Sequence, residues 1–168
     1  MLKVGQYVIG IDPGVHGAIA VLHVPANGPI TIKAAFDLPL AKIGAKQVLV
    51  LPDIVRRLAP FAYQPCYIEA VHAAPGQGVV SMFRFGHAAG ALEGIATALG
   101  CQVTPLPPQA WQKIVRVASD PDAGRHRASQ LFPADAYRFF KKKDHNVADA
   151  VLIALAGARL AQPNRAAA

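Results

Sequence analysis

Hydrophobic residues along the chain fall into short runs separated by turn residues. The first three runs are QYVIGID, GAIAVLHV and PITIKAAF, divided by Pro13-Gly14 and by PANGP. Apolar runs of this length between turn residues predict β-strands, and three strands joined by short turns predict an antiparallel meander. PCYIEA and CQVTPL are two further runs of the same kind, and they predict a fourth and a fifth strand.

The remaining stretches predict helices, over residues 45 to 60, about 79 to 99, 107 to 117, 123 to 131 and 145 to 162. Pro52 lies inside the first of them and must kink or restart it. The order of strands and helices predicts an α/β fold with a mixed five-stranded sheet flanked by helices. We expect a single domain over residues 1–162 and a frayed tail over residues 163–168.

Composition restricts the class of protein. Hydrophobic residues make up 53% of the chain, which is typical of a globular protein and excludes a disordered one. No apolar run is long enough to span a bilayer, and the first residues lead into a strand without a cleavable signal pattern. Cys66 and Cys101 lack metal-site spacing and are interpreted as buried thiols in a reducing compartment. We therefore expect a protein that does not bind membranes and is located in the cytoplasm of a bacterial or phage-infected cell, with an organelle as the alternative.

Positive charge is concentrated in one part of the chain. The formal net charge is +7, and residues 105 to 143 carry eight Lys or Arg against three Asp. A clustered excess of this kind is typical of proteins that bind a polyanion such as nucleic acid. The alternative is a basic surface that serves solubility alone, and charge by itself leaves both interpretations open.

Three acidic residues lie where carboxylates are unusual. Asp12 and Glu69 each end an apolar strand, and Asp149 lies within the Ala-rich final helix. Strand ends in neighbouring strands lie about 4.8 Å apart, so Asp12 and Glu69 can come close together. A turn-capping role explains Asp12 alone, and a buried acid–Lys pair is a second alternative. Three converging acids favour a hard divalent cation with oxygen ligands.

Five motifs taken together and in order carry a resemblance that spans nearly the whole chain. They are IGIDPG, YIEAV, PGQGVVSMFRFGHAAGALEGIATALG, PPQAWQK and KKKDHNVADAVLIALAG. The set resembles the RuvC-like Holliday junction resolvases, in the phage and organellar branch of the RNase H-like superfamily. The resemblance implies an RNase H-like fold. It also implies a structure-selective endonuclease that resolves four-way DNA junctions by metal-dependent hydrolysis, leaving 5′-phosphate and 3′-hydroxyl ends.

The resemblance also implies the site. Asp12, Glu69 and Asp149 would bind two Mg²⁺ ions, for which Mn²⁺ would substitute, with Asp12 as the shared ligand. The family places a fourth ligand, commonly Asp or His, at the position where this chain has Asn146. His145 lies nearly on the Asp149 face of the helix, where it could bind metal or act on the attacking water. Asp144 is the other candidate ligand, with helix capping as its alternative role.

DNA contacts and assembly follow from the same resemblance. The residues expected to meet backbone phosphates are Arg84, Lys113, Lys141, Lys142 and Lys143. The loop from Ala74 to Ser81 could enter the junction centre, and Trp111 is interpreted as a core anchor instead of a stacking platform. A junction with two-fold symmetry calls for a homodimer. Gly86, Gly90 and Gly94 form a small-residue stripe for that interface, with packing against the chain's own sheet as the alternative.

Three rival functions remain to be distinguished. The first is a protein that binds branched DNA without cutting it, and Asn146 favours it because the family's fourth ligand is missing there. The second is a nuclease of the same fold that acts on flaps or branched DNA generally. A sugar-kinase or actin-type ATPase also begins with a strand and an Asp-x-Gly loop. Asp122-Ala-Gly124 is the only other such loop here, no strand precedes it, and the chain is too short for two lobes.

Overall fold

The computed structural model describes residues 6–70, 72, 76, 78–118, 120 and 122–162. The tail at residues 163–168, predicted to fray, lies outside them. Five strands form the main sheet: β1 (Gln6–Asp12), β2 (Ala18–Val24), β3 (Thr31–Asp37), β6 (Pro65–Glu69) and β7 (Gln102–Leu106). Each of the five predicted strands is present, to within two residues at either end.

The strands are ordered β3-β2-β1-β6-β7. The first three form an antiparallel meander, while β6 pairs in parallel with both β1 and β7. The mixed five-stranded sheet predicted from the sequence is therefore confirmed. The parallel pairing of β1 with β6 places the C-terminal ends of these two strands side by side at one end of the sheet.

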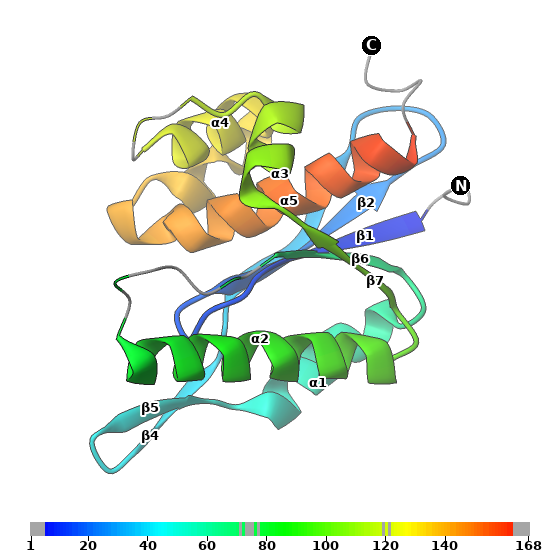
Figure 1. The fold of residues 1–168 in the computed structure, drawn as a ribbon. Coiled ribbons are helices and arrows are strands. Elements are labelled where there is room, and N and C mark those ends of the chain that lie inside the picture. The colour runs from blue at the N-terminus through cyan, green and yellow to red at the C-terminus, as the bar shows by residue number, and fades with distance from the viewer. Residues whose placement is uncertain are drawn as a thin grey trace.

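Helices cover both faces of the sheet (Figure 1). On one face lie α3 (Pro108–Val115), α4 (Ala123–Leu131) and α5 (His145–Ala161), and on the other lie α1 (Leu51–Leu58) and α2 (Val79–Ala98). Short 3₁₀ helices span Ala59–Phe61, Pro133–Phe139 and Lys142–Asp144. In the described part of the chain, no helix combines the length and the hydrophobicity needed to cross a membrane.

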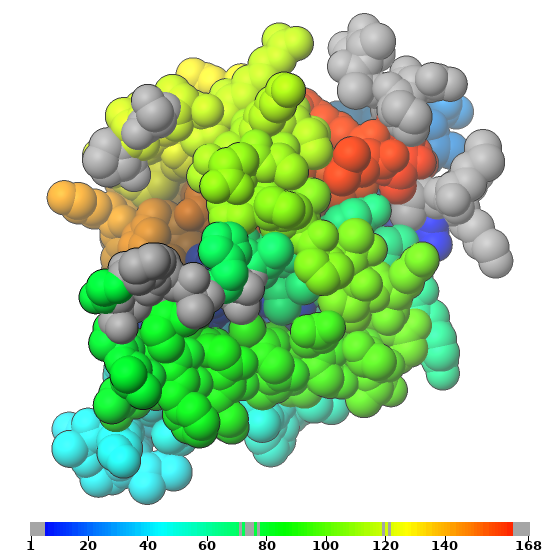
Figure 2. Space-filling model, viewed as in Figure 1, coloured from blue at the N-terminus to red at the C-terminus, as the bar shows by residue number. Residues whose placement is uncertain are grey.

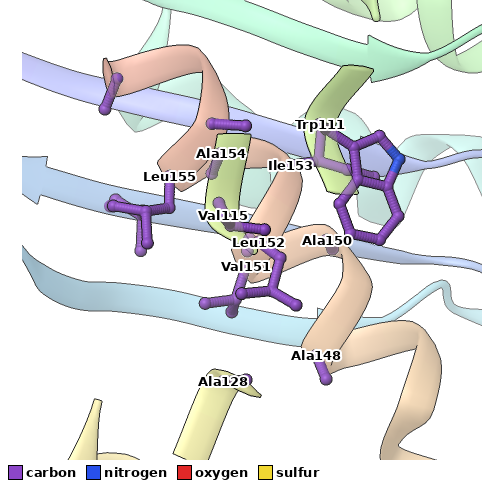
Figure 3. Close-up of a cluster of buried hydrophobic side chains, with 14 of the residues drawn as sticks. Trp111, Val115, Ala128, Ala148, Ala150, Val151, Leu152, Ile153, Ala154 and Leu155 are labelled. Carbon is purple, nitrogen blue, oxygen red and sulfur yellow. The ribbon is translucent and has the colours of Figure 1, made fainter. Parts of the chain in front are cut away.

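Two hydrophobic clusters hold these layers together, one on each face of the sheet. Around α5, the cluster includes Trp111 and Val115 from α3 and Ala128 from α4 (Figure 3). On the opposite face, Ile54 of α1 and Leu92 of α2 pack with strand residues. The sheet is thus buried on both sides, as expected where parallel strands occur.

Close backbone contacts fix α5 against β1 and β6. A β-carbon at Gly10 in β1 would lie 2.2 Å from the carbonyl oxygen of Ala150, and one at Gly157 would lie 2.1 Å from the Tyr67 ring in β6. Neither position can accept a larger residue without moving the helix. The small residues therefore set the distance between α5 and the two strands that end in Asp12 and Glu69.

The predicted helix over residues 45 to 60 is wrong in its first part. Leu40–Ile43 and Lys46–Leu49 form a β-hairpin, β4 and β5, and α1 begins only at Leu51. Gly44, at a φ of 60°, takes the left-handed conformation that lets a two-residue turn join the strands. Pro52 then lies in the first turn of α1, where its missing N–H costs nothing.

Candidate active site

Asp12 and Glu69 occupy matching positions at the ends of neighbouring parallel strands. Ile11 pairs with Ile68, and the two acids each follow by one residue. Side chains alternate along a strand, so Asp12 points to the same face as Gly10, and Glu69 to the same face as Tyr67. Gly10 and Tyr67 both contact α5. The two carboxylates therefore project toward the helix that carries the third.

Asp149 supplies that third carboxylate from the second turn of α5. It directly precedes Ala150, whose carbonyl oxygen lies over Gly10 of β1. Val147, Ala148 and Ala150 around it are buried, whereas Asp149 itself is partly exposed. The packing of α5 on the sheet thus places Asp149 near the C-terminal ends of β1 and β6.

The three acids lie close enough to influence one another's ionisation. Burial, followed by the negative charges of Glu69 and Asp149, raises the pKa of Asp12 to about 8. The pKa of Asp149 is raised to about 6 by burial and then by Glu69, while His145 acts in the opposite direction. Burial also raises the pKa of Glu69, against the lowering effects of Trp111 and His72. The negative charges of Glu69 and Asp149 therefore disfavour ionisation of Asp12, and that of Glu69 disfavours ionisation of Asp149.

No basic side chain neutralises these acids in the described residues. The ion pairs there join Asp53 with Arg56, Asp122 with Arg125 and Asp135 with Arg138. The alternative of a buried acid–Lys pair is therefore not what the structure shows. Partly buried carboxylates that lack a cationic partner provide the hard oxygen donors that Mg²⁺ and Mn²⁺ prefer, so the donor set fits such an ion.

The side chains are not arranged as a closed metal cage. Within the described residues, no three His, Cys, Asp or Glu side chains lie close enough together to hold a metal ion. Carboxylates of like charge repel one another, and Glu69 is turned toward a different partner. Metal binding would therefore require side-chain rotations that bring the oxygens together.

Trp111 is the partner of Glu69. Its indole Nε1–H donates a 2.9 Å hydrogen bond to Glu69 Oε1, and the side chain is only 2% exposed. The interpretation of Trp111 as a core anchor is confirmed, but the residue also orients a carboxylate of the site. Sequence reasoning did not find this role, because the two residues are 42 positions apart.

We expect Trp111→Phe to weaken the site while leaving most of the apolar packing in place. Loss of the hydrogen bond frees Glu69 to rotate and raises its pKa further, because that bond favours the charged carboxylate. Partners of metal ligands typically contribute about 10- to 100-fold to metal affinity or activity. A Mg²⁺ titration of the nuclease activity that the resemblance implies should show a higher half-saturating concentration. An unchanged Mg²⁺ requirement would show that the indole N–H does not act on the site.

Gly124 is a second residue at the site that the sequence pattern did not indicate. A β-carbon at Gly124, in the first turn of α4, would lie 2.6 Å from Asp149 Oδ1. Only a residue without a side chain lets α4 approach this carboxylate. The Asp122-Ala-Gly124 segment thus has a role unrelated to nucleotide phosphate binding.

Gly124→Ala should displace the Asp149 carboxylate and lower the nuclease activity that the resemblance implies by about 10-fold, comparable to the loss of a supporting partner. The matched control is Gly94→Ala in α2, where an added β-carbon meets nothing within 4 Å. Both substitutions raise helix propensity by about 0.5–1 kcal/mol, so thermal unfolding should separate that gain from the local clash. Equal activities of the two variants would contradict the positioning role of Gly124.

Three residues at the start of α5 bear on the fourth position of the predicted site, and each makes a different contact. Asn146 Nδ2–H donates to the carbonyl oxygen of His16, which ties the start of α5 to the loop after β1. Asp144 Oδ2 accepts a 2.8 Å hydrogen bond from the Lys141 N–H and so caps the 3₁₀ turn before α5. His145 Nδ1 lies 3.1 Å from the Lys142 carbonyl oxygen, yet its charge acts on Asp149. Of the three, His145 is the residue whose charge acts on one of the three acids.

The predicted DNA-contacting residues lie on two sides of the acids. Lys113 is exposed on α3, and the exposed residues Lys141, Lys142 and Lys143 directly precede the Asp144–His145 start of α5. Arg84 is exposed on α2, in the opposite layer. The starts of α2 and α5 lie at the same end of the molecule (Figure 2). Ala74, Pro75 and Gln77, in the loop predicted to enter a junction, lie outside the described residues.

The glycine stripe of α2 faces away from the sheet. β-Carbons at Gly86, Gly90 and Gly94 would meet nothing within 4 Å. Packing of this stripe against the chain's own sheet is therefore wrong. Val79 and Phe83 are 84% and 74% exposed at the start of the same helix, so α2 presents an outer surface of small and apolar residues.

The mixed sheet with carboxylates at the ends of β1 and β6 and on α5 defines an RNase H-like fold. Among solved structures, the chain is similar to RuvC of Thermus thermophilus, with a TM-score of 0.65 and 18% identity over 95% of this chain and 97% of that one. A second similar structure is T. thermophilus RuvC in complex with a Holliday junction substrate, with a TM-score of 0.63 and 15% identity over 94% and 96% of the two chains. No protein-family model and no curated protein matches the sequence. The fold predicted from the resemblance is confirmed.

Proposed function

We propose that this protein is a divalent-metal-dependent endonuclease that resolves four-way DNA junctions and leaves 5′-phosphate and 3′-hydroxyl ends. The observation that carries the proposal is the placement of Asp12, Glu69 and Asp149 where β1, β6 and α5 meet, close enough for the charges of Glu69 and Asp149 to disfavour ionisation of Asp12. The similarity to RuvC over nearly the whole chain supports this choice among the nucleases of the fold.

Asp12, Glu69 and Asp149 would hold two Mg²⁺ ions, with Asp12 shared between them and Mn²⁺ as a substitute. Bound there, the ions would activate a water for in-line attack on a phosphodiester and stabilise the leaving 3′ oxygen. Trp111 orients Glu69, and Gly124 leaves space for Asp149. His145, beside Asp149, would position or deprotonate the attacking water.

Branched DNA would be bound by the exposed basic residues near the acids. Lys113 and the run Lys141 to Lys143 project from the α3–α5 layer, where they can contact phosphates without reading sequence. The net charge of +7 supports binding to a polyanion. These contacts would confer affinity that falls steeply with salt.

A homodimer would match the approximate two-fold symmetry of a four-way junction. The outward stripe of Gly86, Gly90 and Gly94 supports α2 as its interface, because small residues let two helices approach closely. The exposed Val79 and Phe83 would add apolar area at the same surface. Sedimentation analysis of the free protein tests this assembly directly.

The decisive experiment compares a synthetic four-way junction, a flap and a linear duplex as substrates in Mg²⁺. Paired cuts in opposite strands of the junction alone would support resolution. Equal cutting of the flap would favour the broader nuclease. Binding without cutting in Mg²⁺ and in Mn²⁺ would favour the inert branched-DNA-binding protein and overturn the proposal.

A further inference from the structure

The β4–β5 hairpin borders a cleft that none of the proposed catalytic residues lines. The cleft has a volume of about 910 Å³ and lies between the hairpin, the loop after β1 and the first turns of α2. Its lining includes His16 from the loop, Lys42 and Lys46 from the hairpin, and Ser81, Arg84 and Phe85 from α2. We refer to it as the hairpin cleft.

The lining of the hairpin cleft is positively charged. Lys42, Lys46 and Arg84 are exposed cations from two elements, and no Asp or Glu belongs to the lining. None of the three takes part in the ion pairs that the structure shows among its described residues. Unpaired cations around a concave surface attract an anionic ligand, and the volume exceeds what a single phosphate group would fill.

The loop after β1 connects the hairpin cleft to the candidate active site. His16 in its wall follows Asp12 by four residues, so the two lie at most about 14 Å apart along the backbone. The carbonyl oxygen of His16 accepts a hydrogen bond from Asn146 of α5, three residues before Asp149. A β-carbon at Gly14 would lie 3.6 Å from the Phe85 ring, so the loop also rests on α2.

The hairpin cleft and the lysines of the α3–α5 layer lie on opposite sides of the sheet. Lys42, Lys46 and Arg84 belong to the layer of α1 and α2, which Figure 1 shows across the sheet from α3, α4 and α5. The hairpin projects past the start of α2, at the end of the molecule where α5 begins (Figure 1). DNA whose scissile phosphate meets the acids would thus have basic surface on both sides.

We propose that the hairpin cleft binds the phosphate backbone of a second arm of branched DNA, and that the β4–β5 hairpin favours branched over linear substrates. This inference rests on the proposed function, because it takes DNA as the ligand of the neighbouring site. Arms that diverge from a junction centre can reach both basic surfaces, whereas a linear duplex held at the acids follows one direction. Arg84 acts here together with the two hairpin lysines.

The test compares two double variants, each made in the Asp12→Asn background so that DNA is bound without being cut. Lys42→Gln/Lys46→Gln removes the hairpin charges, and Lys33→Gln/Arg57→Gln removes two exposed charges from β3 and α1, which lie outside the cleft lining. Affinities for a four-way junction and for a linear duplex are measured as a function of salt. Arg84→Gln provides a second probe that leaves the hairpin intact.

For the junction, we expect the hairpin variant to lower affinity about 10-fold and to reduce the slope of log affinity against log salt by about 2, one for each lost phosphate contact. Arg84→Gln should reduce the slope by about 1, while the control variant and the duplex should change little. Slopes equal to those of the control, or equal losses for junction and duplex, would overturn the inference. Failure of the unmodified protein to cut the junction would overturn the proposed function. The salt slopes would still show whether the hairpin cleft binds DNA.

Discussion

Asp12→Asn is expected to abolish junction cleavage while junction binding persists. The substitution keeps the shape of the side chain but removes the charge that would be shared between two metal ions. Because partners of metal ligands already contribute about 10- to 100-fold, loss of a central ligand should lower the cleavage rate by more than about 100-fold. Single-turnover cleavage and a binding titration on the same labelled junction measure the two effects.

Asp37→Asn is the matched control for this experiment. Asp37 also ends a strand, β3, but it is exposed, and the charges that act on Asp12 are those of Glu69 and Asp149. Cleavage by the control should equal that of the unmodified protein. If Asp12→Asn retained full cleavage, catalysis would have to occur elsewhere. If it lost binding together with cleavage, Asp12 would act through the fold and not through a metal.

The sheet and the three acids could be predicted because they depend on local patterns. Apolar runs bounded by turn residues define the strands, and two of these runs end in Asp12 and Glu69. Parallel pairing of β1 and β6 then brings the two strand ends together. An acid in an apolar helix, such as Asp149, is unusual enough to indicate a site without any knowledge of its neighbours.

The β4–β5 hairpin could not be predicted in this way. Residues 45 to 50 are mainly apolar and lead directly into α1, so they fit the start of a helix as well as a strand. What decides between them is the pairing of Lys46–Leu49 with Leu40–Ile43, together with the left-handed conformation of Gly44. The turn Gly44-Ala45 lacks the Asn-Gly or Asp-Gly sequence that most strongly indicates a hairpin.

Trp111 and Gly124 were missed as site residues for a different reason. Their roles depend on contacts through space, from α3 to the end of β6 and from α4 to α5. A sequence pattern shows that Trp111 is apolar and that Gly124 begins a helix, but not what lies opposite either residue. The supporting residues of a site are therefore harder to predict than its charged ones.

The stability of the metal-free protein should fall as pH rises from about 4 to 8. The ordinary pKa of an Asp carboxyl is 3.8, whereas that of Asp12 in the folded protein is about 8. Between these values the folded state retains a proton that the unfolded chain has released, so the free energy of unfolding decreases with pH. Below about pH 4 both states are protonated and the effect is absent. Asp149, with a pKa of about 6, adds to the decrease in the same direction.

A divalent cation should reverse this loss of stability, because it binds the deprotonated carboxylates and competes with their protons. At 100 times its dissociation constant, a ligand stabilises the folded state by about 2.7 kcal/mol, equivalent to a Tm increase of roughly 5–10 °C for a chain of this size. Thermal unfolding with EDTA or with Mg²⁺ should therefore show a much larger metal effect at pH 8 than at pH 5. Asp12→Asn should flatten the pH dependence in EDTA and remove most of the response to Mg²⁺. A metal effect that is independent of pH would mean that the cation binds outside these three carboxylates, since their raised pKa values require proton release on binding.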